Sequence, residues 1–390
     1  MIDFINEAQA LFETTRALRR DFHRHPELGF NEFRTAGVVT RELNDLGLEV
    51  STGIGKTGVV ALLEGARPGP VVLARFDMDA LPILEETAAE YASQNPGVMH
   101  ACGHDGHTAI GLTVAHILEA HREELGGTVK FVFQPAEEGL GGAEAMLADG
   151  VLENPRPDYC LALHLWNDQP LGWLGVTPGP AMAASDRFQI TLTGRGGHGA
   201  SPHLAVDPVL AGAQVVTALQ SIVARNIDPL KSAVVTVTSL AGGEAFNVIP
   251  STVSIRGTIR SFEPQVRSLV MERFHQVVDG VAQAMGCQAR IETWRITPAV
   301  VNDPQVTNRV QSVAERLLPD CDLDKVERTM GSEDMAYLMD DIPGCYFFIG
   351  SADAARGLNA PHHNPLFDFD EAALPRAAAM MAAAVVELLG

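Results

Sequence analysis

The segment at residues 99–108 reads MHACGHDGHT and holds three histidines, a cysteine and an aspartate. Thiolate and imidazole groups bind zinc-like transition metals in preference to magnesium or calcium. A helical pattern begins near Gly106, so we expect Asp105 to be the N-cap of that helix. Cys102 and His104 would then lie in the preceding loop, two residues apart and on the same side of an extended chain. This spacing predicts that both are metal ligands.

Side chains of the same kind follow other apolar runs. Glu137 and Glu138 come soon after residues 128–133. His164 lies near the end of a further apolar run, and a late histidine pair ends in His363. One tetrahedral ion with an open position needs fewer ligands than these, whereas two metal ions about 3.5 to 4 Å apart would use them all. We therefore expect a dinuclear site.

Adjacent glutamates point in opposite directions from an extended segment, so we expect Glu137 and Glu138 to have different tasks. One would bind metal, and the other would face the open coordination position as a general base toward metal-bound water. Less specific interpretations stay open: solvated loop carboxylates, an inert buried thiol at Cys102, and a hydrogen-bonded core histidine at His164. The other two histidines of the first segment are expected to be packed polar groups or hydrogen-bond donors near the site.

Three apolar runs, at residues 71–79, 128–139 and 159–166, end in these polar clusters and alternate with helical segments. Runs of this kind are typical of parallel strands in an open α/β sheet with helices on both faces. Ligands bind beyond the carboxyl ends of such strands. The pattern therefore places the Cys, His and carboxylate groups at one edge of a sheet.

The pattern changes near residue 184. From there to residue 298 the order is strand, helix, strand, strand, helix, strand, with the alternation of a sheet that is covered on one face. This is the βαββαβ order of a ferredoxin-like α+β domain. We expect a metal-binding catalytic domain at residues 1–183 and 299–390, interrupted by this smaller domain at 184–298.

Composition argues against several classes of partner. The chain has 390 residues and a formal charge of −21. Nucleic acids and anionic membranes need clustered Lys and Arg, so we expect neither as a partner. Five cysteines, an odd number, indicate a reducing compartment, and we expect a cytoplasmic location. We also expect a surface helix from about residue 3 to 25, and no apolar run of the ~18 residues that a membrane span needs.

Eight ordered motifs resemble one family: the dinuclear metal amidohydrolases that include aminoacylases, hippurate hydrolases, auxin-conjugate hydrolases and related carboxypeptidases. The motifs are DMDALP (77–82), MHACGHDGHTA (99–109), QPAEEG (134–139), HLW (164–166), GGHGASPH (196–203), NVIP (247–250), GSEDM (331–335) and HHNP (362–365). The resemblance implies hydrolysis of the amide bond of N-acyl-amino acids, of the aminoacylase or hippurate hydrolase type. A metallo-carboxypeptidase or dipeptidase acting on short peptides is the alternative, and a metal-dependent binding protein without turnover is a second.

The resemblance also implies roles for individual residues. Two divalent ions, zinc or else manganese, nickel or cobalt, would be bound by Cys102, His104, Glu138, His164 and His363. Glu137 resembles the general base, and Asp79 resembles a carboxylate that orients one of the ligands. The family's peptidase and deacylase branches have a bridging aspartate where this chain has Cys102. Whether that thiolate bridges both ions or holds one stays open.

The inserted domain resembles the family's lid or dimerisation domain, which implies a homodimer or homotetramer. His198, in the glycine-rich turn GRGGHGA, resembles a histidine that stabilises an oxyanion, and whether it acts in cis or in trans stays open. Asn247 and Arg260 resemble substrate-binding positions, with Arg260 a candidate to bind the carboxylate of a small N-acyl-amino acid substrate. The less specific interpretations are a turn that needs positive φ at residues 194–199 and an exposed strand arginine.

Overall fold

The computed structural model describes residues 2–390, and they form two compact units. Unit 1 comprises residues 2–181, Val300–Arg328 and Asp334–Gly390, and unit 2 comprises Met182–Ala299 and Thr329–Glu333. Each unit has its own hydrophobic core. The catalytic and inserted roles expected for the two parts of the chain stay predictions.

The centre of unit 1 is an eight-stranded sheet with the order β1-β2-β4-β3-β5-β16-β6-β15. Its central strands β4, β3, β5 and β16 run parallel, which confirms the predicted open, mostly parallel sheet. Strand β2 is antiparallel to β4 and to β1. The strands are β1 (Glu49–Ile54), β2 (Gly58–Glu64), β3 (Arg67–Asp77), β4 (Gly126–Gln134), β5 (Tyr159–Pro170), β6 (Trp173–Gly175), β15 (Asp322–Asp324) and β16 (Gly344–Ala352).

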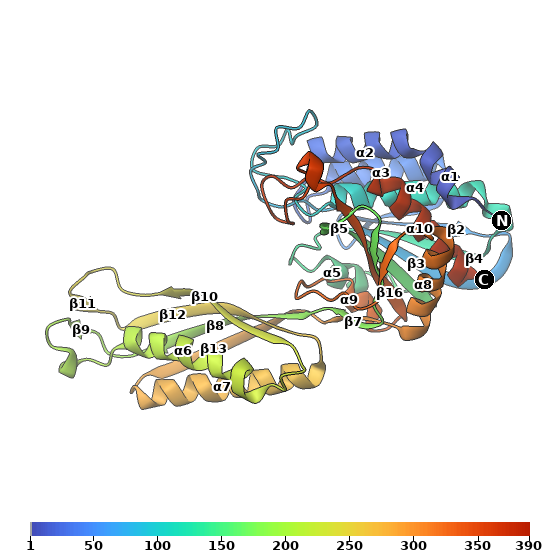
Figure 1. The fold of residues 1–390 in the computed structure, drawn as a ribbon. Coiled ribbons are helices and arrows are strands. Elements are labelled where there is room, and N and C mark those ends of the chain that lie inside the picture. The colour runs from blue at the N-terminus through green and yellow to red at the C-terminus, as the bar shows by residue number, and fades with distance from the viewer. Residues whose placement is uncertain (1) are drawn as a thin grey trace. The chain divides into compact units, whose positions relative to one another are not determined.

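Helices α4 and α10 pack against the central strands and against each other (Figure 1). Helix α10 is rich in alanine and almost entirely buried, because small side chains allow a close approach of helix to sheet. The predicted helix from residue 3 to 25 is two helices that meet at Leu11. The helices of unit 1 are α1 (Phe4–Ala10), α2 (Phe12–Arg24), α3 (Phe33–Asp45), α4 (His104–Ala120), α5 (Gly142–Ala148), α8 (Pro304–Leu317), α9 (Ala336–Met339) and α10 (Ala373–Leu389).

Unit 2 is built on a four-stranded antiparallel sheet with the order β10-β12-β8-β13. Helices α6 and α7 pack on each other and on the sheet (Figure 1). Alternate residues of β8, such as Phe188, Ile190 and Leu192, are buried between sheet and helices. This is the predicted ferredoxin-like βαββαβ arrangement. Its elements are β8 (Ala184–Thr193), α6 (Pro208–Asn226), β10 (Ala233–Ala241), β12 (Thr252–Ser261), α7 (Pro264–Ala284) and β13 (Gln288–Thr297).

Four short strands form two further two-stranded sheets. Strand β9 (Gly197–His198) pairs with β11 (Val248–Ile249), and β7 (Gly179–Met182) pairs with β14 (Val300–Asn302). Among residues 2–390, no helix has the length and apolar character needed to cross a membrane.

Candidate functional site

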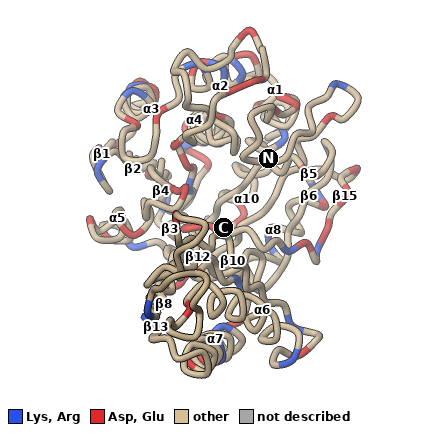
Figure 2. The backbone as a smooth tube through the Cα atoms, turned by 90° about the vertical axis from the view of Figure 1, so that its left-hand side faces the viewer, with Lys and Arg blue, Asp and Glu red and all other residues tan. Residues whose placement is uncertain are grey.

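The candidate site of unit 1 lies where β3 and β4 end and where α4 begins. Because these strands are parallel, their carboxyl ends meet at one edge of the sheet. Acidic segments lie beside α4, β3 and β4 in Figure 2. The loop after β3 carries Asp79, the segment after β4 carries Glu137 and Glu138, and β5 carries His164.

The structure brings the expected metal ligands of unit 1 together in three overlapping groups, each with its donor atoms within 4.8 Å of one another. The groups are Cys102, His104 and His164; Cys102, Glu138 and His363; and His104, Glu137 and Glu138. Within them, Cys102 Sγ lies 3.5 Å from His164 Nε2, and His363 Nε2 lies 3.1 Å from Glu138 Oε1. Thiolate, imidazole and carboxylate in one cluster form a donor set that suits zinc-like ions.

The predicted start of α4 is wrong. Helix α4 begins at His104, and its N-cap is Gly103, whose φ of 89° is left-handed and therefore suits glycine. Asp105 lies in the first turn, fully buried, with its Oδ2 accepting from Arg19 Nε and His23 Nδ1, both at 2.8 Å. The Asp105 carboxylate, which the local sequence pattern predicted to cap the helix, thus forms a long-range ion pair with Arg19 instead. His104 is a residue of the helix and not of the preceding loop.

The expectation that Glu137 and Glu138 point in opposite directions is also wrong. It assumed an extended segment, whereas the chain turns here, with a left-handed φ of 54° at Ala136. Because of this turn, a carboxylate oxygen of each glutamate lies within 4.8 Å of a His104 ring nitrogen. Both side chains therefore reach the same cluster, and the different roles expected for them stay a prediction.

Asp79 fixes the orientation of His104. The His104 Nδ1 contacts the carbonyl oxygen of Asp79 at 3.0 Å and its Oδ1 at 3.2 Å, so this nitrogen carries the proton. Asp79 Oδ2 accepts from the Glu138 amide at 3.1 Å. His104 Nε2 is then left buried without a hydrogen-bond partner among the described residues. Its distance to Asp77 Oδ2 is 3.8 Å, too long for a hydrogen bond. A buried imidazole nitrogen without a hydrogen bond, held in this tautomer, fits a metal ligand.

The charges around the cluster also fit a bound cation. Burial raises the pKa of the Cys102 thiol well above its usual value, and Glu138 and Glu137 raise it further. Burial lowers the pKa of His104, but Asp77 and Asp79 outweigh burial and raise it to about 10. Protein groups alone thus favour a neutral thiol and a charged imidazole. Divalent ions would supply the positive charge and allow the thiolate and neutral imidazole that metal ligation requires.

The peptide of Leu165 connects three histidines. Its carbonyl accepts from His164 Nδ1 at 2.7 Å and from His362 Nε2 at 3.0 Å. Its amide donates to His107 Nε2 at 2.9 Å, and His107 Nδ1 donates to Asp77 Oδ1 at 2.6 Å. The proton of His164 is thereby held on Nδ1, which leaves the lone pair of Nε2 facing Cys102.

Two participants in this network were not predicted in these roles. His362 was recognised only as the neighbour of His363, although the doubled histidine was a signal. Arg75 donates from Nη1 to Asp77 Oδ2 at 2.7 Å and from Nε to Gln134 Oε1 at 2.9 Å, wholly inside the protein. A lone charged residue within an apolar strand was its signal in the sequence. Arg75 and His107 occupy both oxygens of Asp77.

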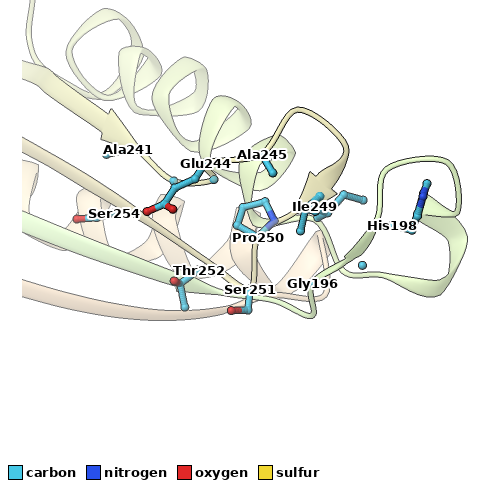
Figure 3. Close-up of a pocket in the computed structure, with 14 residues that line it drawn as sticks. Gly196, His198, Ala241, Glu244, Ala245, Ile249, Pro250, Ser251, Thr252 and Ser254 are labelled. Atoms are coloured by element: carbon cyan, nitrogen blue, oxygen red, sulfur yellow. The ribbon is translucent and has the colours of Figure 1, made fainter.

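The remaining predicted residues belong to unit 2. His198 is exposed on β9, where its Nδ1 accepts from the Ala200 amide at 3.0 Å. The adjacent chain is close, since the Gly199 amide donates to the Asn247 carbonyl at 2.8 Å. These loops border a hollow of about 890 Å³, and His198 stands at its far end from Ala241 (Figure 3).

Arg260 lies at the other end of the unit 2 sheet. It is opposite Ser185 in the β12–β8 ladder, whereas Thr252 is opposite Thr193, just before the glycine-rich turn that carries His198. Eight residues of strand separate Arg260 from Thr252, about 26 Å at ~3.3 Å per residue. The Arg260 guanidinium is half-buried and donates to the Thr258 hydroxyl, and burial lowers its pKa. Within one chain, Arg260 and His198 are therefore far apart.

Comparison with known proteins identifies the family. Residues 73–387 match Peptidase family M20/M25/M40. The chain therefore belongs to this family, a class of amide-bond hydrolases, and the predicted family resemblance is confirmed.

Several members of the family are similar over nearly the whole chain. A putative amidohydrolase, YhaA, of Bacillus subtilis is 43% identical over 96% of this chain and 94% of its own length. An N-acetylcysteine deacetylase of the same organism is 40% identical over 95% of this chain and 96% of its own length. Among solved structures, a dinuclear metal binding peptidase of the M20 family, YXEP from Bacillus subtilis, has a TM-score of 0.85 at 36% identity, covering 98% of this chain and 99% of that one.

Proposed function

We propose that this chain hydrolyses the amide bond of N-acyl-amino acids with two divalent metal ions. The ligands would be Cys102, His104, Glu138, His164 and His363, and the ions zinc, or else manganese, nickel or cobalt. One observation carries the proposal: Glu137 joins His104 and Glu138 in the cluster as a carboxylate beyond these five ligands. A site built only to hold metal has no need of it.

When bound, the metal ions supply a Lewis acid that polarises the amide carbonyl and lowers the pKa of the attacking water. Glu137 accepts a proton from that water as the oxygen forms its bond to the carbonyl carbon. The same carboxyl group then gives the proton to the leaving nitrogen as the C–N bond breaks, so the products are a carboxylic acid and an amine. His198 donates a hydrogen bond to the oxyanion between these steps.

In the proposal, Arg260 binds the carboxylate of the amino-acid part of the substrate through charge-assisted hydrogen bonds, and Asn247 binds the substrate beside His198. Within one chain, about 26 Å of strand separates Arg260 from the end of the sheet that carries His198. A small substrate that contacts both residues therefore needs two chains. This favours a homodimer or homotetramer, with His198 acting in trans and residues 184–298 serving as the lid or dimerisation domain.

Relatives support this substrate class. Besides the N-acetylcysteine deacetylase, an IAA-amino acid hydrolase (ILR1-like 4) of Arabidopsis thaliana is 39% identical over 97% of this chain and 86% of its own length. Hydrolysis of peptides by a carboxypeptidase-type reaction is the second candidate. It is favoured by the Thermostable carboxypeptidase 1 of Saccharolobus solfataricus, which is 35% identical over 94% of this chain and 93% of its own length.

All five cysteines are free, which supports the proposal of a cytoplasmic location.

A substrate panel tests the proposal. Hippurate, N-acetyl-amino acids, indoleacetyl-amino acids and dipeptides are each assayed after chelation and after reloading with zinc, manganese, cobalt or nickel. We expect chelation to abolish hydrolysis, metal to restore it, and N-acyl-amino acids to have the highest kcat/KM. A higher kcat/KM for dipeptides would replace the proposal with the carboxypeptidase or dipeptidase reaction. Full activity without metal would reject the mechanism.

A further inference from the structure

The segment that carries Glu137 and Glu138 has an unusual backbone. Ala136, just before them, has a φ of 54°, a left-handed conformation that residues with a Cβ rarely adopt. Such a conformation persists only when surrounding contacts determine it. The turn is also the reason that both glutamates reach His104, so whatever holds Ala136 also positions the two carboxylates.

One buried carboxylate contacts this turn directly. The Ala136 amide donates to Glu32 Oε1 at 2.8 Å. The other oxygen of Glu32 accepts from the Thr57 hydroxyl at 2.5 Å. Glu32 is the N-cap residue of α3 and has no exposed surface, yet its side chain makes no capping bond to that helix. Its hydrogen bonds go instead to the turn at Ala136 and to the chain before β2.

Close packing confines the same turn on both sides. A Cβ added to Gly29 would lie 3.0 Å from the Cα and Cβ of Ala136, so the chain before Glu32 is pressed against the turn. A Cβ added to Gly142 would lie 1.6 Å from the Pro135 carbonyl oxygen. The Gly142 amide also donates to the Ala136 carbonyl at 3.1 Å. Glu32 thus accepts the hydrogen bond of the Ala136 amide at a turn that is tightly packed against Gly29 and Gly142.

We propose that Glu32 is a positioning residue for the hydrolytic site. By accepting a hydrogen bond from the Ala136 amide, it holds the left-handed turn that presents Glu137 as base and Glu138 as metal ligand. Glu32 touches neither metal nor substrate and acts only through the backbone. The proposal rests on the proposed function for the role of Glu137, but its effect on metal binding through Glu138 is independent of that role.

Three variants separate positioning from general stability. Glu32→Gln keeps an oxygen for the Ala136 amide and an NH₂ group for the Thr57 oxygen. Glu32→Met keeps the length of the side chain and removes the acceptor. Glu27→Met is the matched control, because Glu27 lies in the same segment but accepts from the Arg34 and Thr35 amides at 3.0 and 2.8 Å, in the first turn of α3.

For Glu32→Met we expect kcat to fall ~10- to 100-fold at saturating metal, with KM nearly unchanged, because the base is misplaced while the substrate contacts remain. We also expect metal affinity, measured by equilibrium titration of the metal-free protein with zinc, to fall ~10- to 100-fold. Glu32→Gln should restore both values to near wild type. Glu27→Met should leave both unchanged and lower only the melting temperature.

Wild-type kcat and metal affinity in Glu32→Met would overturn the proposal, as would an equal loss in Glu27→Met or a failure of Glu32→Gln to restore them. If Glu32→Met does not fold, Thr57→Val removes only the hydroxyl that orients Glu32, and an unchanged kcat and metal affinity there would also overturn it. If the wild type hydrolyses no N-acyl-amino acid, the proposed function fails, whereas the zinc titration still tests the positioning role.

Discussion

The cluster of unit 1 and the candidate substrate-binding residues of unit 2 differ in how they are held. In unit 1 the buried His104 and His164 each have one ring nitrogen fixed by a hydrogen bond to a backbone carbonyl. In unit 2 His198, on the short strand β9, and Asn247, in the loop before β11, are exposed. One chain therefore suffices to orient these two candidate metal ligands of unit 1 in advance. The exposed residues lack that support, which agrees with the proposal that they act together with a second chain.

Ion pairs behind the cluster add to its rigidity. Arg19, fully buried, donates to Asp105 Oδ2 and to Asp368 Oδ1, both at 2.8 Å, and thereby joins α2 to the first turn of α4. Removing one partner of a buried pair of this kind leaves an uncompensated charge and typically costs about 3–5 kcal/mol. The first turn of α4, which carries His104, is thus also fixed by the ion pair between Asp105 and Arg19. The turn that carries His198 has no such ion pair among the described residues.

Replacing Glu137, the proposed base in unit 1, should cause the largest fall in kcat. Glu137→Gln keeps the shape of the side chain but cannot accept a proton. We expect kcat to fall ~10²- to 10⁴-fold while both metal ions remain bound, since the five ligands are intact. Metal analysis alongside steady-state kinetics checks this. A fully active variant would remove Glu137 from the mechanism.

The clustering of candidate metal ligands in unit 1 was predictable from sequence because it depends on residue type and strand pattern. The apolar runs of β3 and β4 place the residues that follow them at one edge of the sheet, and β5 carries His164. Cys, His and Glu side chains in such a position predict a metal site. The errors came from contacts between distant parts of the chain. Asp105 pairs with Arg19, 86 residues away, and the turn at Ala136 is bonded to Glu32, 104 residues away. No local pattern contains either contact.

The exposed residues of unit 2 were predictable only through family resemblance. Among residues 2–390, the His198 side chain accepts one hydrogen bond, from the Ala200 amide, and its glycine-rich turn is accounted for by backbone conformation without any catalytic role. Physical reasoning from the residues therefore predicts a site where burial demands an explanation. It is weak where a side chain faces solvent, since solvent satisfies any polar group.

His198→Ala tests the proposed role of an exposed residue of unit 2. Loss of one oxyanion donor typically lowers kcat ~10²- to 10³-fold, and the variant should bind metal as the wild type does. Mixing it with Arg260→Ala, under conditions that allow subunits to exchange, should recover activity, because a mixed dimer contains one site with both residues intact. No recovery on mixing, despite demonstrated exchange, would mean that one site takes both residues from the same chain, which contradicts the proposal.

Arg260→Ala tests binding rather than chemistry. A hydrogen bond to a charged group contributes about 1.5–3 kcal/mol, so we expect KM for an N-acyl-amino acid to rise ~10- to 100-fold. Arg260→Lys is the matched variant, which keeps the charge and loses the planar pair of donors. The corresponding N-acyl amide, which lacks the carboxylate, is the control substrate and should show little change. An unchanged KM for the acid would reject the carboxylate contact.

A variant whose activity should recover at high metal distinguishes the two regions most directly. Asp79→Ala removes the Oδ1 contact with His104 Nδ1 and the acceptor for the Glu138 amide, but the carbonyl of residue 79 still accepts from His104. Because one of the two contacts that fix the His104 tautomer survives, we expect metal affinity to fall only ~10- to 100-fold, with activity recovered at high metal. Excess metal should not rescue His198→Ala, whose defect lies outside the cluster. If excess metal rescued both variants or neither, the contrast between a self-supported cluster and exposed, partner-dependent residues would be wrong.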